Sequence, residues 1–151
     1  RDITPILSAT TSSCAEDSKA KKEASILAIK DLNLRKIASD SAEVHWSPDE
    51  TKFMAEGIGG FKVYDLEDRK EYSLPPARKH LWLPNSRHII LIEEGTISLI
   101  EFDGTNKAVI YAGTFADNFV FPWPDSSRLV IISSIPTPTA SEPNLYGINL
   151  R

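Results

Sequence analysis

Apolar and polar residues alternate along most of the chain beyond residue 42. Phe61 and Val63 flank the polar Lys62, and Ile97 and Leu99 flank Ser98 in the same way. A period of two predicts half-buried strands, because successive side chains of a strand point to opposite faces of a sheet. Val, Ile, Phe, Tyr and Thr dominate these runs, and Gly, Pro, Asn and Asp separate them. The pattern predicts an all-β fold of short strands joined by turns.

Strands are expected at about 43–46, 52–56, 61–66, 71–74, 80–83, 88–93, 96–102, 108–111, 118–121, 129–134 and 144–150. Earlier in the chain, residues 3–10, 26–32 and 35–38 are also expected to be strands. Residues 16–28 are rich in Lys and Ala but have no apolar face before Ile26. We therefore expect a mobile loop there, with room for one helical turn.

Two features repeat along the chain. The first is a turn with Pro followed by Asp or Asn, in Trp46-Ser47-Pro48-Asp49, Trp82-Leu83-Pro84-Asn85 and Pro122-Trp123-Pro124-Asp125. Pro48, Pro84 and Pro124 of these turns lie 36 and 40 residues apart. The second is a strand that ends in Asp65, Glu101 or Asn149, which Asp31 matches earlier in the chain. The turn and the strand end are 16 residues apart in the first two units and 24 in the last. A recurring spacing of this kind indicates a structural repeat.

A four-stranded antiparallel unit repeated every 40 or so residues is typical of a β-propeller blade. We expect one domain over residues 1–151, a β-propeller fragment of about three and a half four-stranded antiparallel blades. The complete blades are expected at 41–76 and 77–114, and incomplete ones at 1–40 and 115–151.

The Trp46-Ser47-Pro48-Asp49 turn and the Val63-Tyr64-Asp65-Leu66 strand resemble the WD-like repeat of bacterial TolB-type propellers. The resemblance covers residues 42–150 well and 1–40 more weakly. Glu50, Ser86 and Ser126 stand where that repeat usually has Gly, and Pro122 stands at an aromatic position. The resemblance implies an extracytoplasmic, periplasmic bacterial location. It leaves the activity open, because the fold serves many functions.

Closed propellers have four to eight blades, so three and a half blades leave two open ends. We expect either a segment of a larger ring or self-association through the open blade ends, because exposed blade faces and strand edges favour association.

Composition narrows the classes of function. The chain has 17 basic and 21 acidic residues and a formal charge of −4, which disfavours nucleic acid as a partner. The longest apolar runs, 89–92 and 129–132, are too short to span a membrane. Cys14 is the one cysteine, and the three histidines show no zinc spacing. No nucleophile elbow or phosphate-binding loop is present. We therefore expect no catalytic residues, no metal and no cofactor.

Binding is expected on one face of the fold, because the long loops 11–25 and 136–143 lie on the same side as the linkers 39–42, 75–79 and 113–117. The candidate binding residues are Lys21, Lys22, Arg78, Lys79, His80, Thr137 and Thr139. Tolerated insertions and solvated charges are the alternative interpretation. The repeated residues are expected to be structural: Trp46, Trp82 and Trp123 in packing between blades, and Asp49, Asp65, Asn85, Glu101, Asp125 and Asn149 in turn hydrogen bonds.

These features favour a non-catalytic propeller module that binds a protein or a cell-envelope component. One alternative is a gating or substrate-recognition segment of a hydrolase or peptidase whose catalytic residues lie elsewhere. Another is a structural repeat without a ligand.

Overall fold

The computed structural model describes residues 17–134 and 142–150. The chain divides into two compact units, residues 1–42 and 43–151, which are described in turn.

The first unit is helical where the structure describes it, with a helix at residues 17–27 and α2 (Leu32–Asp40). The side chain of Asp31 caps α2, accepting hydrogen bonds from the backbone N–H groups of Asn33 and Leu34 at 2.9 and 3.1 Å. Leu34 and Ala38, four residues apart, are buried on one face of α2. An Asp at this position thus begins a helix in this unit.

The strands predicted at 26–32 and 35–38 are therefore wrong, as is the loop predicted at 16–28. The incomplete first blade predicted at 1–40 has no strand in its described part, and the strand expected at 3–10 lies outside the described residues. The prediction failed because Asp31, the cap of α2, follows apolar residues in the same pattern as the Asp65 that ends a strand.

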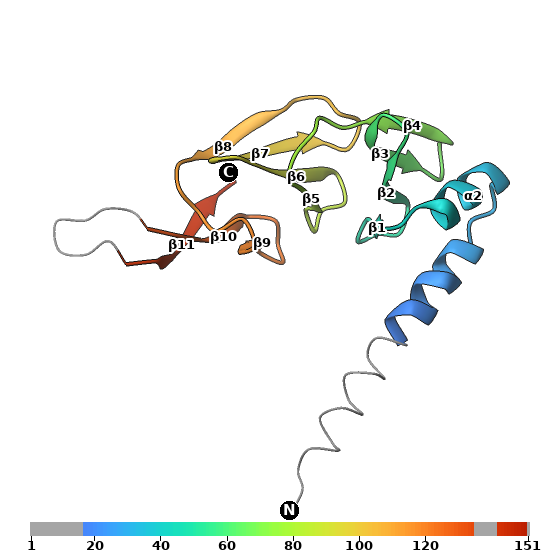
Figure 1. Cartoon of the computed structure of the whole chain (residues 1–151), viewed down its shortest axis with the longest axis horizontal. Helices are drawn as coiled ribbons and strands as arrows, with labels where there is room; N and C mark the ends of the chain where they lie inside the picture. Colours follow the sequence, from blue (N-terminus) through green and yellow to red (C-terminus); the bar gives the residue numbers. More distant parts are fainter. Residues whose placement is uncertain (1–16, 135–141, 151) are drawn as a thin grey trace, which may run out of the picture. The chain divides into compact units, whose positions relative to one another are not determined.

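The second unit consists of three antiparallel sheets, each with its strands in chain order (Figure 1). The first sheet contains β1 (Val44–Trp46), β2 (Lys52–Gly57), β3 (Gly60–Asp65) and β4 (Lys70–Ser73). The second contains β5 (Lys79–Trp82), β6 (His88–Glu93), β7 (Thr96–Glu101) and β8 (Ala108–Ala112). The third contains β9 (Val120–Pro122), β10 (Arg128–Ser133) and β11 (Asn144–Asn149). The strands predicted beyond residue 42 are confirmed.

The register of the two middle strands repeats from sheet to sheet. Lys52 lies opposite Asp65, His88 opposite Glu101, and Arg128 opposite Asn149. The middle strands of the three sheets are therefore equivalent residue by residue. The longer spacing in the third unit falls in the connection between β10 and β11.

The turn before the second strand also repeats. The N–H groups of Glu50, Ser86 and Ser126 donate to the carbonyls three residues earlier, at 2.8, 3.0 and 2.8 Å. These residues have φ of 59°, 57° and 60°, in the left-handed region that favours glycine. The non-glycine residues at the position after Pro-Asp or Pro-Asn thus keep the backbone geometry that glycine normally supplies.

Two apolar clusters join the sheets. Met54, Val63, Leu74, Ile89, Leu91 and Ile100 pack between the first and second sheets. Leu83, Ile90, Ile92, Ile97, Val120, Leu129 and Ile131 pack between the second and third. The middle sheet is consequently covered on both faces, and the four central residues of β6 are all buried. The second unit is a partial, propeller-like all-β fold.

No helix among residues 17–134 and 142–150 is both long and apolar enough to cross a membrane.

Candidate binding face

The antiparallel strand order places two kinds of connection on one side of the second unit. These are the turns between second and third strands, 58–59 and 94–95, and the linkers between sheets, 74–78 and 113–119. We call this side the loop face. Because the sheets beneath it are packed together, residues on the loop face are held by a rigid scaffold, which is the usual setting of a binding site.

Arg78 links three connections of the loop face. Its backbone N–H donates to Ile92 O at 2.8 Å, which fixes the linker against β6. Its guanidinium lies 3.3 Å from Glu94 Oε2 and 2.5 Å from Asp117 Oδ2. The hydrogen bond to Asp117 and the nearby Glu94 raise the pKa of Arg78. The Arg78 side chain is still half exposed, so some of its five N–H donors face solvent.

Glu93, which precedes Glu94 in the chain, forms a separate ion pair with Lys107. Lys107 Nζ donates to Glu93 Oε1 at 2.7 Å, and Ser98 Oγ donates to Oε2 at 2.9 Å. The hydrogen bond from Lys107 lowers the pKa of Glu93. Both carboxylate oxygens are thereby used inside the second sheet, which gives this pair a structural role.

His80 lies buried between the first and second sheets. Its Nε2 is 2.8 Å from Pro75 O, and because a carbonyl can only accept, Nε2 carries the proton. The ring stacks on Phe61 with centroids 4.3 Å apart. Nδ1 is buried and has no hydrogen-bond partner within the described residues. Burial lowers the pKa of His80, opposed by the bond to Pro75. His80 is thus a neutral packing residue below the loop face.

A shallow hollow of about 270 Å³ lies on the loop face where the second and third sheets meet. Its apolar lining includes Phe115, Ile132 and Pro143. Ser133 Oγ and Tyr111 Oη both donate to Thr114 O, at 2.5 and 3.0 Å. These bonds attach the start of the linker 113–119 to β8 and β10. The hollow can accept a small apolar side chain.

The other predicted binding residues fall in three parts of the chain. Lys79 is exposed at the start of β5. Lys21 and Lys22 lie on the helix 17–27 of the first unit, whose position relative to the second unit is not defined. Thr137 and Thr139 lie outside the described residues.

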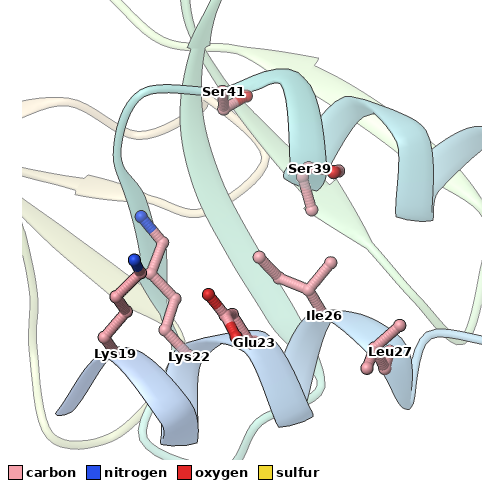
Figure 2. A pocket seen from close by; sticks show the side chains of 8 residues that line it. Lys19, Lys22, Glu23, Ile26, Leu27, Ser39 and Ser41 are labelled. Carbon is pink, nitrogen blue, oxygen red and sulfur yellow. The ribbon is translucent and has the colours of Figure 1, made fainter. Parts of the chain in front are cut away.

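Lys22 contributes to a hollow of about 500 Å³ within the first unit. Figure 2 shows side chains of helix 17–27, among them Lys19, Lys22 and Ile26, on one side of it, and Ser39 and Ser41 at the end of α2 on the other. Lys22 Nζ donates to Ala42 O at 3.4 Å, and Ser41 Oγ donates to Ile37 O at 2.7 Å. These polar groups satisfy carbonyls around the α2 terminus, as helix ends require.

The three repeated tryptophans have different surroundings. Trp82 Nε1 donates to His45 O at 2.9 Å, across the first two sheets. Trp46 packs against Phe53, and its indole nitrogen is buried with no hydrogen-bond partner among the described residues. Trp123 is 49% exposed, with the Arg128 guanidinium 5.8 Å from its ring centroid. Equivalent sequence positions therefore differ in burial.

Each of the repeated turn residues makes the same kind of hydrogen bond. Asp49, Asn85 and Asp125 each accept through Oδ1 from the backbone N–H two residues later, at 3.1, 3.0 and 2.9 Å. This is the Asx-turn bond, which fixes the turn locally.

The repeated strand-end residues are less uniform. Asp65 Oδ1 accepts from the N–H groups of Glu67 and Asp68 at 2.9 and 3.0 Å. Glu101 accepts from Asn106 Nδ2 at 2.9 Å, and Asn149 is exposed at the end of β11. Sequence equivalence at this position thus does not impose one set of contacts.

Sequence reasoning placed Arg78 and the linker carrying Asp117 on one face but did not pair them. Thirty-nine residues separate the two, and no local pattern joins them. Charge was the one feature of the sequence that could have suggested these pairs. Glu94 and Asp117 are acidic, and both lie in connections on the same side of the sheets as Arg78.

Within the described part of the chain, no group of three or more His, Cys, Asp or Glu side chains could hold a metal ion. Comparison with models of protein families gives no match, and neither does comparison with curated proteins.

Proposed function

We propose that this chain is a non-catalytic propeller module that binds a protein partner through its loop face. The resemblance of its repeat to TolB-type propellers supports this function, because such a scaffold presents connections from several blades on one side. The observation that carries the proposal is Arg78, held between Glu94 and Asp117 while half exposed.

The two carboxylates keep the Arg78 guanidinium in place without using all its donors. Its planar fork can therefore bind a carboxylate or a backbone carbonyl of a partner with little further loss of side-chain freedom. The partner we expect is a protein segment that offers an acceptor to Arg78 and an apolar side chain to the hollow at Phe115 and Ile132. A polar rim around an apolar core is typical of protein interfaces, and Asp117, the partner of Arg78, directly follows Ala116 in the lining of the hollow.

Photo-crosslinking tests the proposal. A photoreactive amino acid at Ile58, fully exposed in the β2–β3 turn, probes the loop face. The same group at Glu67, exposed in the β3–β4 turn, probes the opposite side. In an extract of the source cells, we expect one protein to be captured from position 58 and not from 67.

Arg78→Ala should reduce that capture about tenfold, as expected for loss of a charge-assisted hydrogen bond. Lys107→Ala, which also removes one cation, is the matched control and should leave capture unchanged. Equal capture from both positions, no capture, or capture insensitive to Arg78→Ala would each contradict the proposal.

A further inference from the structure

The linker 74–78, which carries Arg78, is attached to the sheets at few points. The backbone N–H groups at its two ends donate to carbonyls of β3 and β6, the second of these bonds joining Arg78 to Ile92 at 2.8 Å. Two of the residues between the ends are prolines, which have no N–H to donate. His80 Nε2 supplies a further bond, to Pro75 O at 2.8 Å. The position of the linker therefore depends in part on a histidine side chain.

His80 stands where the other two sheets have valine. In the pairing of first and second strands, Val44 and Val120 occupy the position of His80. Val120 is 3% exposed and His80 is 5% exposed, so an apolar side chain can fill this position when it is buried. Packing alone thus does not require an imidazole here. The imidazole differs from valine in its bond to Pro75 and in its ability to take up a proton.

The surroundings of His80 suit only the neutral ring. Nε2 carries the proton that Pro75 O accepts, which leaves Nδ1 without a proton. Nδ1 is buried and has no hydrogen-bond partner among the described residues. A proton taken up at Nδ1 would create a buried cation with an N–H group that has no acceptor, which costs free energy. The protonated ring is therefore more stable in water than in this place.

The charged groups around His80 do not remove this cost. Three titratable side chains act on it, His45 on β1, Glu56 on β2 and Glu93 on β6. The two carboxylates favour the protonated ring and a charge on His45 opposes it, but burial is the largest effect and lowers the pKa of His80. Both oxygens of Glu93 already accept from other side chains. The neighbouring Phe61 ring of β3 carries no charge.

We infer that His80 is a pH-sensitive switch, which fixes the linker 74–78 while its ring is neutral and releases the linker when the ring is protonated. The protonated ring can solvate its second N–H only by leaving the stack on Phe61 for water. It then gives up the bond to Pro75 O, and the linker is no longer held between its ends. Two arrangements of one segment, biased by one proton, are sufficient for such a switch.

Release of the linker acts on the loop face through Arg78. The guanidinium is held between Glu94 and Asp117 only while the backbone of Arg78 stays in place. Since this consequence rests on the proposed function, we expect the loop face to bind its partner at neutral pH and to release it in mild acid. The switch itself is a property of the chain alone and can be tested without a partner.

Amide hydrogen exchange measured by NMR, with each rate divided by the intrinsic rate at the same pH, tests the switch. The Arg78 N–H bonds to Ile92 O, and in the next linker the Ala116 N–H bonds to Ile132 O at 2.9 Å, the equivalent acceptor. Protection of Arg78 should fall about three- to tenfold between pH 7 and 5.5, because the released state binds one more proton. Protection of Ala116 should change less than about twofold, because its linker is attached without a histidine.

Two variants identify the titrating group. His80→Val introduces the residue that the other sheets have at this position, and it should make the protection of Arg78 the same at pH 7 and 5.5. His88→Gln is the matched control, because it removes a histidine at the opposite end of β6 and should keep the fall. Circular dichroism first shows that each variant is folded. The comparison of Arg78 with Ala116 in the unmodified chain needs no variant.

Protection of Arg78 that does not change with pH would overturn the inference. So would a fall that His80→Val retains. An equal fall at Arg78 and Ala116 would also overturn it, by showing that acid weakens the whole unit and not this linker. None of these results depends on a partner, so photo-crosslinking from position 58 remains a separate test of the proposed function.

Discussion

Trp82 donates its indole N–H to the backbone carbonyl of His45, 37 residues earlier, at 2.9 Å. Trp82 lies in the second sheet and His45 in the first, so this bond connects two sheets that have no shared strand. Their remaining contacts include the apolar cluster around Met54 and Ile89. The indole thus adds a directional contact to an otherwise non-directional interface.

Replacing Trp82 by Phe should lower the free energy of unfolding by about 1–2 kcal/mol, because the His45 carbonyl loses its partner and the interface loses volume. Trp123→Phe is the matched control, since Trp123 is 49% exposed, and it should change stability by less than about 0.5 kcal/mol. Urea unfolding followed by circular dichroism measures both. Equal losses in the two variants would show that the bond to His45 contributes little.

Glycine at the left-handed turn positions should stabilise the fold. Glu50→Gly and Ser126→Gly relieve a φ near 60° at a smaller entropic cost, for a net gain of roughly 0.5–1 kcal/mol each. Ser86→Gly should gain less, because Ser86 Oγ accepts from the Asp49 N–H at 3.0 Å. Thermal unfolding of the three variants gives the order. A Ser86→Gly gain as large as the others would contradict the role of that bond.

Stability should fall in mild acid because of His80. Burial lowers its pKa in the folded protein, so the unfolded chain binds the proton first as the pH falls through the ordinary value of about 6.5. The free energy of unfolding should therefore decrease below that pH, by up to about 1.4 kcal/mol per pH unit, and level off below the folded-state pKa. His80→Gln keeps a donor for Pro75 O but cannot titrate. Its stability should be flatter between pH 7 and 5.5, whereas parallel curves would exclude His80 as the source.

Gly104 marks a close approach between sheets. A Cβ there would lie 2.7 Å from Ser73 O, and its φ of +82° is unfavourable for other residues. Gly59 has a φ of +94° but nothing within 4 Å of its Cβ position. Gly59→Ala should cost only the backbone strain, about 1–2 kcal/mol, and Gly104→Ala at least about 1 kcal/mol more for the steric clash. Chemical denaturation separates the two, and equal costs would mean that the loop at Gly104 moves freely.

The strands beyond residue 42 could be predicted because their causes are local. The alternation of apolar and polar side chains determines each strand. The turn before the next strand is fixed by a side chain that accepts from the backbone N–H two residues later, as at Asp49 and Asn85. Local rules were insufficient in the first unit. Asp31 and Asp65 both accept from backbone N–H groups two and three residues later, yet one starts a helix and the other ends a strand.

Much of the candidate site could not be predicted, because its contacts join residues far apart in the sequence. Arg78 and His80 are two residues apart, and both were candidate binding residues. The structure instead pairs Arg78 with Asp117 and stacks the buried His80 ring on Phe61. The sequence by itself determined strand order, turn chemistry and the side on which connections gather. Only the tertiary structure decided which charges are paired and which ring is buried, because these depend on how neighbouring sheets pack rather than on any one segment.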